Sequence, residues 1–188
     1  MVRARLEEEF IAKAAAMDAE IESFSSIADA LAFASRFLKQ QDIKNIAVSP
    51  DVLLPPAEMS EWPVLKPEKK DDYLAAGAGL VEADYGISDT GTLVHLDRND
   101  EEKIVWTLPP ICLCLLDKRR IVQDLGAVAE VLSAHLFLTS LEVRQVSLVT
   151  GPSRTADIEG RLSLGVHGPS RLVILLFEGK TSGSHEKD

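Results

Sequence analysis

Two glycine-bearing loops carry the side chains best suited to hold a small anion. In the first loop three hydroxyls and several backbone N–H groups lie close together between two apolar segments. Its glycine permits a tight turn. Two interpretations stay open: the loop binds an anion or a substrate carboxylate, or it is a hairpin turn whose polar residues hydrogen-bond to their own backbone. The residues of this loop are Ser88, Asp89, Thr90, Gly91 and Thr92.

The second loop follows the apolar run QVSLVT. A strand, a glycine turn and a helix beginning near Ser153 would direct unpaired N–H groups at an anion. Arg154 could add a bidentate donor. Asp157 and Glu159 already place negative charge near that helix start, where the helix dipole favours it. The predicted ligand-binding residues here are Gly151, Pro152, Ser153, Arg154 and Thr155.

One histidine is a candidate for proton transfer. His167 lies between Gly165 and Gly168, just before an apolar run, and imidazole titrates near neutral pH. We include His167 and Gly168 among the predicted ligand-binding residues. Asp89 and Glu82 are the other acid–base candidates. His95 and His135 lie within predicted regular elements, and we interpret them as packing residues. No catalytic role is assigned beyond these three candidates.

The sequence predicts no metal site in this chain. Cys112 and Cys114 are the whole thiol inventory, and their spacing puts both on one face of a strand. Two thiols are too few for a closed zinc site or an iron–sulfur cluster. The chain also lacks a phosphate-binding P-loop, a G-x-S-x-G elbow and an H-E-x-x-H motif.

Periodic apolar residues predict the elements that position these loops. An amphipathic helix is expected over residues 3–22, and a second helix capped by Ser26, with Asp29 three residues further on. Strands interleaved with helices indicate an α/β layered sandwich with a mixed, mostly parallel sheet and N-terminal helices. Strands are predicted at residues 43–49, 81–88, 92–96, 103–106, 111–116, 145–150 and 171–177, and helices at 120–138 and near 153.

Three segments carry a resemblance to a known family. GISDTGTLV (86–94), the Leu-Pro-Pro before ICLCLL, and above all GPSRTADIEGRLSLGVHGP (151–169) resemble the lactate-utilisation protein C family, the LUD domain. The resemblance covers roughly residues 27–177 and implies a fold of the NagB/RpiA/CoA-transferase-like group. We divide the chain into an N-terminal helix (1–25), the LUD domain (26–178) and a disordered tail (179–188).

The resemblance implies a function as well. The family takes part in oxidising L-lactate to pyruvate, as the cluster-free component beside partner proteins that hold the iron–sulfur clusters. No cofactor is then expected in this chain itself, and a small anionic ligand is expected at its loops. The alternative is a free-standing NagB/RpiA/CoA-transferase-like enzyme that acts on a phosphorylated or CoA-linked small molecule.

Composition limits the partners. Of 188 residues, 30 are acidic and 20 basic, so the formal net charge of −10 argues against duplex nucleic acid or an anionic membrane surface as a general partner. No run approaches the roughly 18 apolar residues of a membrane span. Acidic residues follow the start of the chain where a secretory signal would be apolar, so we expect a soluble cytoplasmic protein. Six bases nevertheless lie around the resembling motifs, which leaves room for a local anion site: Lys118, Arg119, Arg120, Arg154, Arg161 and Arg171.

Overall fold

A computed structural model of the chain describes residues 2–50, 52, 62–138, 143–156, 162–164 and 168–179. In its first half the elements are α1 (Val2–Ala16), β1 (Glu20–Ser23), α2 (Ile27–Gln40), β2 (Ile46–Val48), the 3₁₀ helix η1 (Lys70–Ala75), β3 (Ala78–Glu82), β4 (Tyr85–Ile87) and β5 (Thr92–Asp97). The second half contains α4 (Asp100–Thr107), β6 (Ile111–Asp117), η2 (Lys118–Arg120), β7 (Ile121–Val122), α5 (Leu125–Leu138), β8 (Gln145–Val149), β9 (Arg154–Ala156), β10 (Leu162–Leu164) and β11 (Arg171–Phe177).

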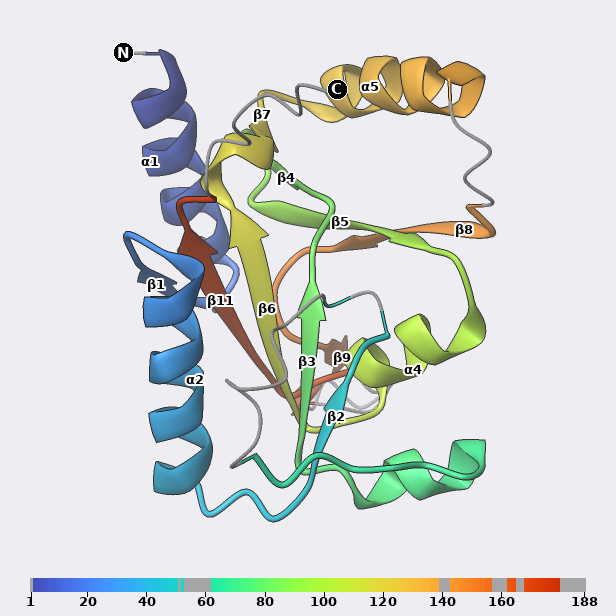
Figure 1. The fold of residues 1–188 in the computed structure, drawn as a ribbon. Coiled ribbons are helices and arrows are strands. Elements are labelled where there is room, and N and C mark those ends of the chain that lie inside the picture. The colour runs from blue at the N-terminus through green and yellow to red at the C-terminus, as the bar shows by residue number, and fades with distance from the viewer. Residues whose placement is uncertain are drawn as a thin grey trace, which may run out of the picture.

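A five-stranded parallel sheet forms the centre of the molecule (Figure 1). Its strand order is β1-β11-β6-β3-β2, and every neighbouring pair is parallel. The two central strands are the apolar runs ICLCLL and RLVILLF, which are buried as expected for strands covered on both faces. The α/β class predicted from the sequence is therefore confirmed.

Helices cover the two faces of this sheet, and alternate side chains of each strand point to opposite faces. On one face Leu113 and Leu115 pack with the apolar side of α2. On the other face Cys112, Cys114 and Leu116 pack with Phe10 and with apolar residues of α4. Both thiols thus lie on one face, as their spacing predicts.

A second, four-stranded sheet stands beside the central one. Its order is β7-β4-β5-β8, with β4 antiparallel to β5, β5 antiparallel to β8, and β4 parallel to β7. Ile87 and Val94 of this sheet pack against Val128 of α5. The mixed strand directions expected from the sequence are therefore found in this second sheet, whereas the central sheet is purely parallel.

The N-terminal helix is shorter than predicted. It ends at Ala16 because Asp18 adopts a left-handed conformation (φ 62°), which aspartate tolerates better than most residues. The chain then forms β1, whose residues Glu20–Ser23 pair with Val173–Leu176 of β11. The first 23 residues therefore contribute both a helix and the edge strand of the central sheet.

Four other predicted elements differ from the structure, two in type and two only in their bounds. Residues 103–106 belong to helix α4, whose Asn99 side chain caps the N–H groups of Glu101 and Glu102. The segment 81–88 is two strands, β3 and β4. The helix predicted from residue 120 begins only at Leu125, where Asp124 accepts a hydrogen bond from the N–H of Ala127.

The fourth correction concerns the second loop. Instead of a helix near Ser153, residues 154–156 form strand β9, which pairs antiparallel with β10. The nearly all-apolar run QVSLVT predicts a strand covered on both faces, but β8 is a half-exposed strand of the second sheet. The predicted tail lies outside the described residues except for Gly179.

Candidate functional site

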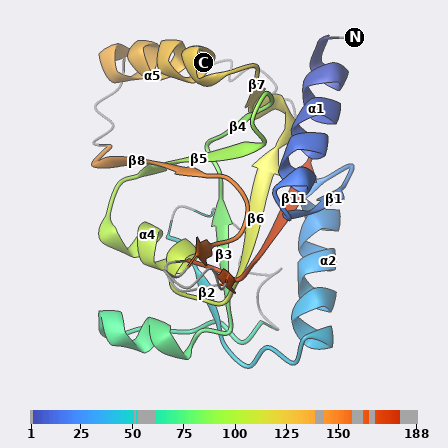
Figure 2. The same cartoon turned by 180° about the vertical axis from the view of Figure 1, so that it is seen from behind.

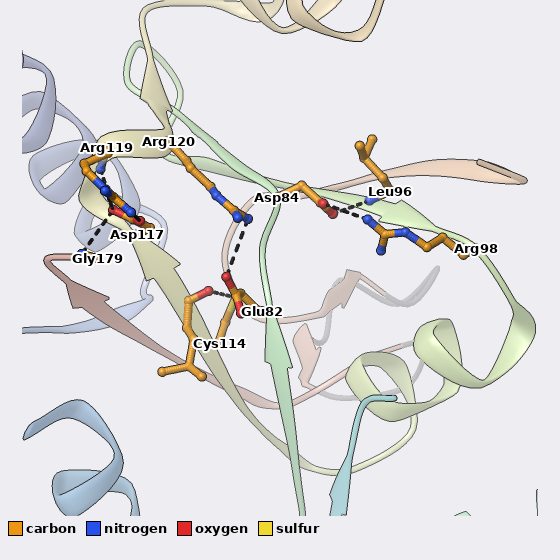
Figure 3. Close-up of polar contacts among 10 residues, drawn as sticks. Glu82, Asp84, Leu96, Arg98, Cys114, Asp117, Arg119, Arg120 and Gly179 are labelled. Atoms are coloured by element: carbon orange, nitrogen blue, oxygen red, sulfur yellow. Dashed lines mark hydrogen bonds and ion pairs between the residues drawn. The ribbon is translucent and has the colours of Figure 1, made fainter. Parts of the chain in front are cut away.

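The carboxyl ends of β3 and β6 meet at one edge of the parallel sheet, where open α/β sheets bind their ligands. Glu82 is the last residue of β3, and Asp117 is the last residue of β6. The 3₁₀ turn η2, Lys118–Arg120, follows β6 directly and brings Arg119 and Arg120 to this edge (Figure 3). We call Glu82, Asp117, Arg119 and Arg120 the carboxyl-edge cluster.

Asp117 and Arg119 form the rigid half of this cluster. Asp117 is 4% exposed, and it accepts hydrogen bonds from the Arg119 backbone N–H (2.9 Å), from Nε (3.0 Å) and from Nη2 (2.6 Å). Burial raises the pKa of this carboxyl, but the hydrogen bonds from Arg119 outweigh it and hold the pKa below its usual value. The pair is therefore charged and held in place at neutral pH.

Glu82 and Arg120 form the accessible half of the cluster. Arg120 Nη1 lies 3.5 Å from Glu82 Oε1, and the two side chains are 46% and 23% exposed. Such a solvent-facing pair holds its two members only weakly. Arg120 can therefore turn its guanidinium to the carboxylate of a ligand, and the Glu82 carboxylate can accept a proton or a hydrogen bond from a ligand hydroxyl.

The chain between β3 and β4 is held by Asp84. One carboxylate oxygen accepts the N–H of Leu96 (2.8 Å), and the other pairs with Arg98 Nη2 (3.3 Å), as Figure 3 shows. These contacts join the end of β3 to β5 in the second sheet. They fix the direction in which the chain leaves Glu82.

A buried polar cluster lies beside this edge and was missed by the sequence reasoning. Asp97 accepts hydrogen bonds from the Ser147 hydroxyl and from Trp106 Nε1 (3.4 Å), while the His95 ring stacks on Trp106 with centroids 5.4 Å apart. The side chains close on one another and leave no room for a water molecule. The only sequence signal for this cluster is the spacing of His95 and Asp97: two residues apart in a strand, they point to the same face of the sheet.

The first predicted loop is a hairpin turn between β4 and β5. Gly91 has φ 68°, and its N–H donates to Ile87 O (2.9 Å). The N–H groups of Ser88 and Asp89 donate to carbonyls of the β7 region. The buried Ser88 hydroxyl donates to Glu9 Oε2 of α1 (2.8 Å), so this loop holds a carboxylate of its own chain.

The structure brings the two predicted loops together. The hydroxyls of Thr92 and Thr150 are hydrogen-bonded at 2.7 Å. Both loops lie against the C-terminal end of α1: a Cβ on Gly91 would stand 2.3 Å from Ala14 N, and one on Gly151 would stand 2.2 Å from Met17 O. Helix α1 therefore covers the surface that the two loops form.

The remaining residues of the second loop also contact neighbouring segments. Arg154 forms an ion pair with Asp18, and the N–H of Ser153 donates to Pro169 O (2.8 Å). Gly168 lies beside Ser153, with its Cβ position 3.2 Å from Ser153 Cβ. Pro152 is half-buried. His167 and the side chain of Thr155 lie outside the described residues, so the roles given to this loop stay predictions.

Among the described residues, no group of three or more histidine, cysteine or acidic side chains is arranged to hold a metal ion. Cys112 and Cys114 are buried in the sheet, and burial raises the pKa of Cys112 to about 12. The described helices include none that is both long and apolar enough to cross a membrane.

The protein is an α/β protein with charged side chains at the carboxyl ends of its parallel strands, where such folds bind ligands. Comparison with known proteins shows which family it belongs to. Residues 7–177 match the LUD domain, so the chain belongs to the LUD-domain family. It is 29% identical over 125 residues to lactate utilization protein C of Geobacillus kaustophilus, covering 64% of this chain and 52% of that protein. It is 34% identical over 107 residues to lactate utilization protein C of Halalkalibacterium halodurans, covering 56% and 46%.

Two further comparisons extend over more of the chain. An uncharacterized Escherichia coli protein, YkgG, is 28% identical over 165 residues, covering 82% of this chain and 71% of that protein. A crystal structure of a DUF162 family protein from Deinococcus radiodurans superposes with a TM-score of 0.72 at 22% identity, covering 94% of this chain and 99% of that one. The chain spans about half the length of the lactate utilization proteins C that it matches.

Proposed function

We propose that this chain is the cluster-free, lactate-utilisation protein C-like component of a cytoplasmic system that oxidises L-lactate to pyruvate. The LUD match over residues 7–177 carries this proposal, and relatives named lactate utilization protein C support it. In this proposal the two electrons from lactate pass to iron–sulfur partner proteins. This chain supplies a binding surface for the partners and for the small anion.

The two cysteines support this division of labour. Cys112 and Cys114 are buried among apolar side chains of the central sheet, and the raised pKa of Cys112 disfavours the thiolate that a cluster requires. Iron–sulfur clusters are held by cysteine thiolates in most proteins. The clusters therefore belong to the partners in this proposal.

The accessible half of the carboxyl-edge cluster supports binding of a 2-hydroxy acid. A guanidinium binds a carboxylate through two parallel N–H donors, and Arg120 is the more exposed of the two guanidinium groups in the carboxyl-edge cluster. The Glu82 carboxylate, 3.5 Å away, can accept a hydrogen bond from the 2-hydroxyl group. We expect lactate to replace part of the weak contact between these two side chains.

Reconstitution tests this function. The chain is mixed at micromolar concentration with the iron–sulfur proteins of the lactate-utilisation system, and L-lactate-dependent reduction of an artificial acceptor is measured without oxygen. The expected result is a stable complex with activity. Absence of both co-purification and lactate-dependent reduction would contradict the proposal.

A matched pair of variants tests the site. Arg120→Gln removes the guanidinium at the carboxyl edge, and Arg36→Gln removes an exposed guanidinium from α2. We expect Arg120→Gln to raise the lactate concentration for half-maximal rate by about tenfold or more, since hydrogen bonds to charged groups contribute about 1.5–3 kcal/mol. Equal behaviour of the two variants would remove Arg120 from the site.

Glu82 supports one other candidate function, a free-standing enzyme of the NagB/RpiA/CoA-transferase type. Its carboxylate is partly exposed at the carboxyl end of a central parallel strand, where it could do acid–base or nucleophilic work on a phosphorylated or CoA-linked molecule. A thermal-shift panel of CoA, nucleotides, sugar phosphates and lactate separates the two functions, because a bound ligand raises the melting temperature. A shift with CoA or a phosphorylated compound, lost in Glu82→Gln, would favour this candidate.

A further inference from the structure

Strand β8 is the outer strand of the second sheet. It pairs on one side with β5, from Leu93 opposite Val149 to Asp97 opposite Gln145, and within the described chain no strand pairs with its other side. In Figure 2 the strand lies at the near margin of the sheet, with no labelled helix or strand in front of it. Edge strands carry unpaired N–H and C=O groups that another strand can bind.

This edge lacks the features that normally prevent such pairing. The segment Gln145–Val149 contains no charged residue, no proline and no glycine. Val146 and Leu148 are 45% and 51% exposed. They stand opposite Leu96 and Val94 of β5, which pack in the apolar core between this sheet and α5. The apolar side chains on this face of the sheet therefore continue as far as its unpaired edge.

We infer that β8 pairs antiparallel with β8 of a second copy of this chain, forming a symmetric dimer with one continuous eight-stranded sheet. A two-fold axis through Ser147 places Val146 opposite the partner's Leu148, and the partner's Val146 opposite Leu148. Such an isologous contact is self-complementary. A second β8 fits this edge because it places apolar side chains beside Val146 and Leu148 and introduces no charged residue.

The dimer is expected to be of moderate affinity. One pair of five-residue strands buries less surface than the roughly 1,600 Å² of a standard interface, so the dissociation constant should lie in the micromolar range. Sedimentation equilibrium between about 1 and 200 µM should therefore show the mass rise from 20.5 kDa towards about 41 kDa, twice the chain mass. A single species of 20.5 kDa over this whole range would overturn the inference.

Charge variants test the register. In the double variant Val146→Lys/Leu148→Lys, each lysine faces a lysine of the other copy, which should raise the dissociation constant of the dimer at least about tenfold. Val146→Glu/Leu148→Glu should do the same, whereas an equimolar mixture of the two variants should dimerise again, because each lysine then faces a glutamate. Leu74→Lys, at a 70%-exposed position on η1, should leave the dimer unchanged.

Amide exchange of the unmodified chain identifies the strand directly. Protection of the β8 amides should increase with protein concentration, while amides of η1 should not change. A dimer that forms without protecting β8, or that ignores both pairs of charge substitutions, would overturn the inference. Failure of the mixed variants to dimerise, when each is shown to be folded by circular dichroism, would overturn the antiparallel register.

Discussion

Helix α1 can pack closely against the first glycine loop because Gly91 has no side chain. A Cβ at this position would lie 2.3 Å from Ala14 N and 2.7 Å from Ala14 Cα, far inside van der Waals contact. The residue also has φ 68°, in the left-handed region. The substitution Gly91→Ala therefore introduces both backbone strain and a collision with the helix backbone.

The two costs can be added from known magnitudes. A left-handed conformation costs a non-glycine residue about 1–2 kcal/mol. Overpacking against a neighbour that must shift costs about 1–3 kcal/mol. We therefore expect Gly91→Ala to lower the free energy of unfolding by about 3 kcal/mol, a large share of the roughly 5–15 kcal/mol typical of a domain.

Urea denaturation followed by circular dichroism measures this change. With a denaturant slope of about 2 kcal/mol per molar, the midpoint should fall by about 1.5 M. Gly126→Ala is the matched control, because Gly126 lies in α5 and its Cβ would meet only the Asp124 side chain, at 3.1 Å. Alanine favours a helix over glycine, so this control should be unchanged or more stable by up to about 1 kcal/mol.

A loss of less than about 0.5 kcal/mol in Gly91→Ala would mean that α1 does not rest on the loop. Limited proteolysis adds a local readout. If the collision displaces α1, cleavage within residues 2–16 should accelerate in Gly91→Ala and stay unchanged in Gly126→Ala.

Three further predictions concern buried polar groups and thiols. Ser88→Ala removes the hydrogen-bond donor to Glu9 and should lower the free energy of unfolding, measured by urea denaturation, by about 1.5–3 kcal/mol. The control Ser25→Ala removes an exposed hydroxyl bonded to Asp29 and should lower it by less than about 0.5 kcal/mol; equal losses would contradict the contact between Ser88 and α1. Asp117→Asn should cost about 1–3 kcal/mol at pH 7. Because folding lowers the pKa of Asp117, this carboxylate stabilises the fold fully above its unfolded pKa of about 3.9, and the stabilisation is lost as the pH falls through the lower folded pKa. The difference in unfolding free energy between wild type and Asp117→Asn should therefore persist down to about pH 4 and narrow below it. A difference that stays constant from about pH 7 to about pH 2.5 would contradict this prediction. With its pKa raised to about 12, Cys112 should not react with a thiol reagent at pH 8 until the protein is unfolded, and rapid labelling of the native chain would contradict its burial.

The parallel core could be predicted from the sequence because its signals are local. The runs ICLCLL and LVILLF are apolar without interruption, and they form β6 and β11, two neighbouring inner strands that are buried after their first residue. The Ser26 cap is likewise local: its hydroxyl accepts the N–H of Asp29 three residues later, at 3.2 Å. The hairpin at Gly91 follows from a glycine in a polar turn between two apolar strands.

Elements that depend on a distant partner could not be predicted in this way. Strand β1 has no apolar alternation of its own, and it exists because β11, about 150 residues later in the chain, offers a free edge. Strand β9 replaces the predicted helix because it pairs with β10. In each case hydrogen bonds to another segment outweighed the local propensity.

The candidate site shows the same division. The residue types could be read from the sequence: Glu82 in a predicted strand, three consecutive bases after the run ICLCLL, and two hydroxyl-rich glycine loops. Tertiary structure decided which of them meet. It brought Glu82 to Arg120 across 38 positions of the chain, because β3 and β6 are parallel neighbours that end at one edge, and it placed α1 over the two loops.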